Sequence, residues 1–178
     1  MSWSKPLTRN SAVYHFRPVE RGDLLLLKRW LEAPHVAEWW GDPDGEISEI
    51  AEFLDSSPVK PYIVSLLGRP IGYIQAYDPH EEFDHPYQDQ PPGTFGIDQF
   101  IGVREMTGLG HGPAMIKAFC RTLFAEGAKR VVTDPDPDNR NAIRAYEKAG
   151  FRKDDIRNTE YGTVQLMHLD ASDEMRKR

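Results

Sequence analysis

Apolar residues recur three or four positions apart in four segments of the chain, which predicts amphipathic helices there. The segments are residues 24–31, 46–54, 114–124 and 140–149. In the first, Leu24, Leu27 and Leu31 fall on one face, and Asp23 stands at the N-cap position. Gly150 follows the last segment, where glycine is favoured just past a helix C-terminus.

Short runs rich in β-branched and aromatic residues alternate with these helices and predict strands. The strands are expected at residues 14–18, 61–67, 71–77, 94–103, 130–133, 151–157 and 164–169. The second and third of them are separated only by Gly68-Arg69-Pro70, which favours a hairpin. Mixed strands with intervening helices indicate an α/β (α+β) fold.

Two segments are expected to be irregular. Pro34 interrupts the first helix, and residues 38–45 are expected to form a loop that carries Trp39 and Trp40. Residues 78–92 form a long polar loop with several acids, and long loops inside a domain are often functional. The acids of that loop are candidates to line a site for a polycation, although any single one is as easily an exposed charge.

Composition narrows the function classes. A length of 178 residues suggests one domain, residues 1–178, with residues 1–12 and 171–178 as loosely ordered tails. The net charge of −6 argues against nonspecific binding of nucleic acid and favours a cationic, small-molecule partner. No apolar run is long enough to span a bilayer, so we expect a cytoplasmic protein without a membrane partner. A single cysteine, Cys120, excludes an internal disulfide, and we expect a buried, inert thiol there.

Three alternating glycines, Gly108, Gly110 and Gly112, lie between a predicted strand and a predicted helix. A backbone of this kind approaches an anion closely, and free amides at the helix start hold a phosphate. The loop lacks the lysine and hydroxyl of a Walker motif and the spacing of a dinucleotide fingerprint, so a pyrophosphate cradle or a simple tight turn remains. Pro113 is expected at a first helical position.

A second motif runs from Asn139 to Phe151, with Tyr146 about two helical turns after Asn139. The pattern Asn-x-x-Ala-Ile-x-x-Tyr-Glu-Lys-Ala-Gly-Phe resembles the late motif of the GNAT acetyltransferases. In that family a glycine loop before it binds the pyrophosphate of acetyl-coenzyme A. The resemblance implies the GNAT fold, a mixed and mostly antiparallel twisted sheet of six to seven strands with about four helices.

Further segments narrow the resemblance to aminoglycoside 6′-N-acetyltransferases. They are Trp39-Trp40-Gly41, Pro61-Tyr62-Ile63, Pro70 to Gln75, Gly96 to Gln99 and Thr133-Asp134-Pro135. The chain is similar, less closely, to acyltransferases that modify lysine or hydroxylysine in siderophore synthesis. The resemblance implies direct transfer of an acetyl group from acetyl-coenzyme A, as cosubstrate, to a primary amine of a polyamino sugar.

Two residues are candidates for catalysis. Asp98 lies on the strand before the glycine loop, where the resemblance puts the reacting amine. The ordinary pKa of an aspartate is about 4, so Asp98 is a weak base. We therefore expect it to hold the ammonium group of the acceptor and to relay the ammonium proton through water. Its alternative is a carboxylate that caps the backbone. Tyr146 is the candidate acid for the leaving thiolate, and its alternative is a core tyrosine.

The remaining site residues follow from the same resemblance. The coenzyme site is expected at Ile101, Val103, Thr107, Gly108, Leu109, Gly110, His111, Gly112, Pro113, Asn139, Ala142 and Tyr146. The amine site is expected at Trp39, Trp40, Asp98 and Asp134. Asn139 alternatively serves only as a helix N-cap, and at least one tryptophan alternatively packs in the core.

The chain departs from the family at Thr107, where the glycine loop usually begins with Gln or Arg. That difference leaves room for a non-catalytic acyl-coenzyme A-binding module as a rival function, beside an acetyltransferase for siderophore lysine, polyamine or protein amines. No metal is expected, because the spacing of His80 and His85 with the acids between them matches no standard zinc pattern. The sequence leaves monomer and homodimer open.

Overall fold

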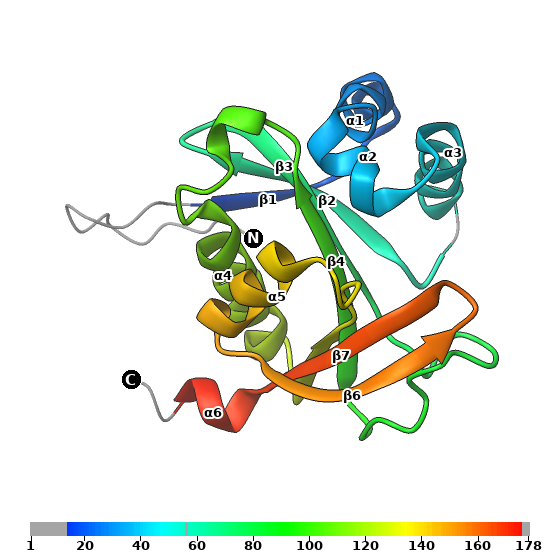
Figure 1. The fold of residues 1–178 in the computed structure, drawn as a ribbon, viewed down its shortest axis with the longest axis vertical. Coiled ribbons are helices and arrows are strands. Elements are labelled where there is room, and N and C mark those ends of the chain that lie inside the picture. Colours follow the sequence, from blue (N-terminus) through cyan, green and yellow to red (C-terminus); the bar gives the residue numbers. More distant parts are fainter. Residues whose placement is uncertain (1–13, 56, 176–178) are drawn as a thin grey trace.

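The computed structural model describes residues 14–55 and 57–175. In that part of the chain, seven strands form one mixed sheet, and helices cover both of its faces (Figure 1). The strands are β1 (Tyr14–Pro18), β2 (Lys60–Leu66), β3 (Arg69–Tyr77), β4 (Thr94–Ile101), β5 (Arg130–Thr133), β6 (Arg152–Thr159) and β7 (Gly162–Asp170). The α-helices are α1 (Leu24–Leu31), α2 (Pro34–Trp40), α3 (Pro43–Phe53), α4 (His111–Ala125), α5 (Arg140–Ala149) and α6 (Ala171–Met175), with short 3-10 turns at Arg21–Asp23 and Arg104–Met106.

The sheet order is β1-β2-β3-β4-β5-β7-β6, and every neighbouring pair is antiparallel except β4 and β5. The parallel pairing covers only three positions, from Thr94 opposite Arg130 to Gly96 opposite Val132. Strand β4 then runs on to Ile101 without a partner on that side, while β5 ends at Thr133. The two strands therefore part near the middle of the sheet, and this opening positions the site described below.

Alternation along the strands sorts neighbouring side chains to opposite faces. Val64 packs in the core under α4 and α5, whereas Ile63 packs in the core under α1, α2 and α3. In β4, Ile97 belongs to the first core and Phe100 to the second. Asp98 shares the parity of Phe100, so its carboxyl group lies on the α1–α3 side of the sheet.

The prediction that residues 38–45 form a loop is largely wrong. Residues 34–40 form helix α2, because Pro34 occupies its first turn, where a missing N–H costs nothing. Helix α3 then starts at Pro43, and the side chain of Asp42 accepts a hydrogen bond from the Gly45 amide at 2.8 Å. Proline thus begins two helices here. The long loop of residues 78–92 is present as predicted.

Other element boundaries moved by a few residues. Helix α4 begins at His111, so Pro113 is the third helical residue and not the first. Asp23 makes no side-chain cap for α1; its carboxylate instead binds Arg17 and the Glu20 amide. Helix α5 matches the expectation, with Gly150 in a left-handed conformation at its end.

The C-terminal segment expected to be loose begins with a helix. Helix α6 follows β7 directly, and its Glu174 is buried, where it forms an ion pair with Arg121 of α4 at 2.7 Å. With α2, this helix raises the number in the described residues from the expected four to six. The expected N-terminal tail and residues 176–178 lie outside the described residues. Within residues 14–55 and 57–175, none of the helices has the length and apolar character needed to cross a membrane.

Candidate functional site

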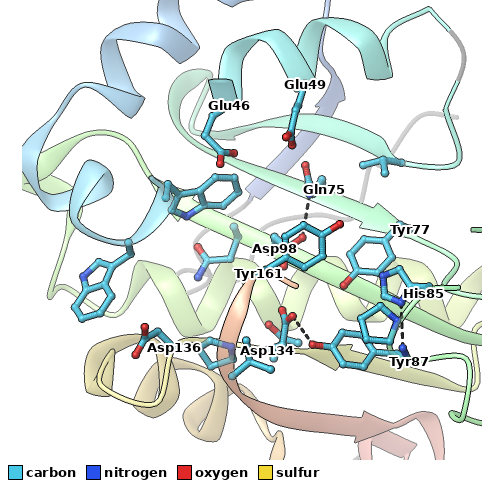
Figure 2. Close-up of a pocket in the computed structure, with 18 of the residues that line it drawn as sticks. Glu46, Glu49, Gln75, Tyr77, His85, Tyr87, Asp98, Asp134, Asp136 and Tyr161 are labelled. Atoms are coloured by element: carbon cyan, nitrogen blue, oxygen red, sulfur yellow. Dashed lines mark hydrogen bonds between the residues drawn. The ribbon is translucent and has the colours of Figure 1, made fainter. Parts of the chain in front are cut away.

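A cleft of about 740 Å³ opens where β4 and β5 part (Figure 2). Its floor is made by the side chains of Gln75, Asp98 and Asp134 from neighbouring strands and strand ends. Helix α3, the 78–92 loop and the β6–β7 turn form its walls. Seven carboxyl groups line the cleft and, among the described residues around it, no lysine or arginine does: Glu46, Glu49, Glu52, Glu82, Asp98, Asp134 and Asp136.

Two of these carboxyl groups face each other at the floor. Asp98 and Asp134 influence each other's ionisation, because the charge of Asp98 raises the pKa of Asp134. Gln75 donates to the Asp98 carboxylate at 2.9 Å, and the Tyr87 hydroxyl donates to Asp134 (Figure 2). Burial, followed by the charge of Asp98, raises the pKa of Asp134 to about 7, and burial raises the pKa of Asp98 as well. Asp98 and Asp134 are half-buried, because protein surrounds each side chain except where the cleft exposes it to solvent.

Helix α3 supplies an acidic wall that the sequence reasoning missed. Glu46, Glu49 and Glu52 repeat every third residue, so they project from one side of the helix into the cleft. Burial and the nearby charges of Glu49, Asp98 and Asp42 raise the pKa of Glu46 to about 7. A cationic ligand would relieve this repulsion, because it stabilises the ionised form of each carboxyl group.

The two predicted tryptophans have different surroundings. Trp40 packs edge-on against Phe100 and Tyr73, with ring centroids 4.9 Å and 5.8 Å away, so it belongs partly to the core. Trp39 is 40% exposed and lines the cleft mouth. Both tryptophans line the cleft, and the alternative of core packing applies in part to Trp40.

A second cavity of about 520 Å³ adjoins the first and contains the glycine loop. Gly108 and Gly110 have φ angles of 72° and 85°, which non-glycine residues adopt at a cost. An added Cβ at either position would meet nothing within 4 Å, so both face open space. The first turn of α4 leaves the amides of His111 and Gly112 without partners inside the helix, and the helix dipole adds positive potential. These features fit a bound pyrophosphate.

Positive side chains border this second cavity. Three cationic side chains, Arg104, Arg144 and Lys148, line it together with one carboxylate, Glu38, in contrast to the acidic lining of the first cavity. The Thr107 hydroxyl donates to the Arg104 carbonyl at 2.7 Å and so closes the short turn before the loop. Thr107 therefore has a local structural role, and the three cations are the side chains available to contact a phosphate.

Most of the residues predicted for the coenzyme line this cavity: Ile101, Thr107, Gly108, Gly110, Gly112, Pro113, Asn139 and Ala142. The structure does not bring Val103, Leu109 and His111 to its wall. Val103 packs beside the α1–α3 core, Leu109 is 67% exposed, and the His111 ring forms a hydrogen bond with the Tyr14 hydroxyl at 2.8 Å. The Ile101 carbonyl interacts with the His35 ring at 2.9 Å, which adds His35 as a wall residue.

The two cavities meet at Trp39, Trp40, Gln99, Asn139 and Ala142. Asn139 caps α5 by accepting from the Ala142 amide at 3.1 Å, so its predicted capping role and its position at the junction both hold. Tyr146 lines the acidic cleft beside this junction and packs against Phe151 in the core. Burial raises the pKa of Tyr146, so its hydroxyl remains protonated.

Several residues that line the cleft were not predicted as site residues from the sequence. Gln75 and Tyr77 are on β3, and His85 and Tyr87 come from the 78–92 loop. Register explains the first pair, because Gln75 lies opposite Asp98 across the β3–β4 ladder. The length and acidity of the loop were the available hints, but of the candidate acids Glu81, Glu82, Asp84 and Asp89 only Glu82 lines the cleft.

The histidines of the 78–92 loop and Cys120 do not form a metal site or a reactive-thiol site. His80 binds Asp78 and the Gln90 carbonyl within its own loop, and no group of three or more His, Cys, Asp or Glu side chains in the described residues is arranged to hold a metal ion. Cys120 is 1% exposed in the core, and burial raises the pKa of its thiol. This agrees with the inert thiol expected from the sequence.

Comparison with known proteins adds an independent line of observation. The family model described as acetyltransferase (GNAT) domain matches residues 20–159. The chain is 33% identical over 170 residues to aminoglycoside N(6')-acetyltransferase type 1 of Klebsiella pneumoniae, and the match covers 90% of this chain and 85% of that protein. It is 27% identical over 172 residues to lysine N-acyltransferase MbtK of Mycolicibacterium paratuberculosis, covering 93% of this chain and 77% of that protein.

A solved structure is similar across nearly the whole length. The crystal structure of aminoglycoside acetyltransferase AAC(6')-Ib in complex with coenzyme A and kanamycin superposes with a TM-score of 0.85 at 32% identity. The match covers 93% of this chain and 99% of that chain. The fold expected from the sequence is thereby confirmed.

Proposed function

The chain belongs to the acetyltransferase (GNAT) family, and we propose that it transfers an acetyl group from acetyl-coenzyme A to a primary amine of a polyamino sugar. The chemistry of N-acetyl transfer follows from the family. The acceptor class is supported by the aminoglycoside N(6')-acetyltransferase and AAC(6')-Ib relatives and by the cleft itself.

The opposite charge of two connected cavities is the observation that carries the proposal. One cavity holds seven carboxyl groups, and the other holds the glycine loop with Arg104, Arg144 and Lys148. A polycation fits the first and a pyrophosphate fits the second, because each cavity has the complementary potential. Their junction is where an amine and an acetyl group would meet.

At the coenzyme end, the amides of the glycine loop and the start of α4 would hold the pyrophosphate. In the family, a Gln or Arg at the first loop position supplies a side-chain contact to the pyrophosphate, and Thr107 stands there in this chain. That contact is supplied instead by the cations that line the cavity, Arg104, Arg144 and Lys148. When bound, acetyl-coenzyme A supplies an activated acetyl carbon and a thiolate leaving group.

At the amine end, Asp98 and Asp134 hold the acceptor ammonium at the cleft floor. The amine must lose a proton before it reacts, and the carboxyl pair accepts it and passes it to water in the cleft. Trp39 contacts the ring face of the acceptor, and the glutamates of α3 bind its remaining ammonium groups.

The transfer step balances without a further reactant. The neutral amine nitrogen forms a bond to the acetyl carbon, the carbon–sulfur bond breaks, and the nitrogen releases its second proton to water in the cleft to give the neutral amide. Tyr146 stabilises the leaving sulfur by donating a hydrogen bond. Its raised pKa makes complete proton transfer to sulfur unfavourable, so the thiolate receives its proton from water.

Release of free thiol from acetyl-coenzyme A across a panel of amines tests the proposal. We expect higher kcat/KM for kanamycin-like sugars than for lysine, hydroxylysine or putrescine, and a large loss of turnover with Asp98→Asn at unchanged coenzyme affinity. Asp84→Asn is the matched control, since Asp84 is an exposed acid of the neighbouring loop that does not line the cleft. Host cells that express the protein should also become less sensitive to kanamycin.

An acetyltransferase for siderophore lysine or a small diamine is the second candidate, supported by the 27% identity to MbtK. The reverse ranking of substrates in the same panel would establish it. Coenzyme binding with no thiol release for any amine would instead indicate a non-catalytic acyl-coenzyme A-binding module.

A further inference from the structure

We propose that Tyr87 is a positioning residue of the amine site, which orients the Asp134 carboxyl group and is itself held in place by Arg157. The inference rests on the proposed function for its consequence in catalysis, but its geometry stands on Tyr87, Asp134 and Arg157 alone.

Tyr87 is an unusual residue for a polar surface loop. It is only 1% exposed and packs with Val132 of β5 and Leu166 of β7, both fully buried. The Tyr87 ring packs within this small apolar cluster, and its hydroxyl donates to Oδ2 of Asp134 (Figure 2). Asp134 is the residue that directly follows β5. Burial and the Asp134 charge raise the pKa of Tyr87, so the phenol stays protonated and remains the donor.

Arg157 of β6 anchors the loop segment that carries this tyrosine. Its guanidinium donates to both carboxylate oxygens of Asp89, at 3.0 Å and 2.8 Å, and to the Pro86 carbonyl at 3.1 Å. It also lies 5.7 Å from the centroid of the Tyr87 ring. The residues on both sides of Tyr87 are therefore tied to the sheet, which fixes the ring in one orientation.

The consequence concerns the charge of the Asp98–Asp134 pair. A hydrogen bond donated to a carboxylate stabilises its ionised form, so the Tyr87 hydroxyl favours the state of the pair that attracts an ammonium. Without that donor, Oδ2 of Asp134 loses its hydrogen bond from Tyr87 and the ionised carboxylate is less stable. The Asp98–Asp134 pair should therefore stay protonated to higher pH. The orientation of Asp134 would also be lost, because no other side-chain hydrogen bond to Oδ2 is present in the described residues.

Other ionisable groups around the pair stay the same when only this hydroxyl is removed. They are Glu46, Glu49 and Glu52 of α3, Tyr77 of β3, Glu82 and His85 of the 78–92 loop, Asp136 after β5, Tyr146 of α5, Arg157 of β6 and Tyr161 of the β6–β7 turn. A shift in the titration of the pair in a Tyr87→Phe variant is therefore attributable to the lost donor.

The test compares wild type with Tyr87→Phe in two measurements. Carbon-13 NMR follows the carboxyl resonances of Asp98 and Asp134 with pH, without coenzyme or acceptor. We expect the titration midpoint to rise by about one pH unit. Thiol release with kanamycin is then measured against pH, and the acidic limb of kcat/KM should move upward by a similar amount while the KM for acetyl-coenzyme A is unchanged.

Two further variants complete the design. Tyr62→Phe is the matched control, because Tyr62 packs against Phe119 away from the cleft and should leave both measurements unchanged. Arg157→Gln should shift both in the same direction as Tyr87→Phe but less, since the hydroxyl remains; an unchanged profile would remove Arg157 from the proposal.

The outcomes separate this inference from the proposed function. An NMR midpoint equal to that of wild type in a folded Tyr87→Phe protein would overturn the positioning role and leave Tyr87 as a core residue only. A raised midpoint together with no acetylation of any amine by wild type would support the positioning of Asp134 and reject the proposed function.

Discussion

Asp134→Asn is expected to stabilise the folded protein while it abolishes acetyl transfer. Asp134 is held at the cleft floor beside Asp98, where its ionised form is disfavoured by burial and by the neighbouring charge. Asparagine has nearly the same shape and stays neutral. Its side-chain oxygen still accepts from the Tyr87 hydroxyl, and it places no second negative charge beside Asp98.

The size of the effect follows from the pKa of Asp134, which is raised from its ordinary 3.8 to about 7. That difference corresponds to about 4 kcal/mol when the group is ionised in both states, and solvent in the cleft makes this an upper limit. A carboxyl group with a raised pKa in the folded state lowers stability progressively as pH rises from 3.8 to about 7. The gain from asparagine is therefore close to zero at pH 3.5, about 1.5 kcal/mol at pH 5 and largest above pH 7.

Urea unfolding of both proteins at pH 5 and pH 8 measures this difference, and thiol release with kanamycin measures the loss of activity. Asp136→Asn is the control, because Asp136 lies two residues away in the same turn and is exposed; it should change stability by no more than about 0.5 kcal/mol. The reasoning fails if the Asp134→Asn protein is less stable than wild type at pH 8, or if its gain is the same at both pH values.

Two other substitutions test the site and its support. Tyr146→Phe should lower kcat by about tenfold to a hundredfold with little change in the KM of either substrate, because only the hydrogen bond to the leaving sulfur is lost; a wild-type kcat in steady-state assays would exclude Tyr146 from the mechanism. Gly96→Ala should destabilise the protein by about 1–3 kcal/mol in urea unfolding and raise the acceptor KM. A Cβ at position 96 would lie 2.1 Å from the Tyr77 ring, which must then move into the cleft. Unchanged stability would show that the ring can shift freely.

The sequence was most informative where chemistry depends on local backbone. The glycine loop and the Asn139–Phe151 motif predicted a helix that begins after the glycines and a capped helix with Tyr146, and the structure has both helices. Strands β1 and β5 and helices α1 and α5 matched residue for residue, because their ends are marked by local signals or strong apolar patterns. Helix α2 was missed because Pro34 was read as a stop, although proline also starts helices.

The sequence by itself determined most of the element types, since periodicity and turn chemistry are local properties, and its resemblance to the GNAT acetyltransferases supplied the candidates Asp98, Asp134 and Tyr146. Tertiary structure alone decided that Asp98 and Asp134 line the same cleft, that Arg104, Arg144 and Lys148 border the glycine loop, and that Tyr87 reaches Asp134 from a loop 47 residues earlier. These contacts join segments distant in the chain. They exist because β4 and β5 part at the centre of the sheet and bring several elements around one opening.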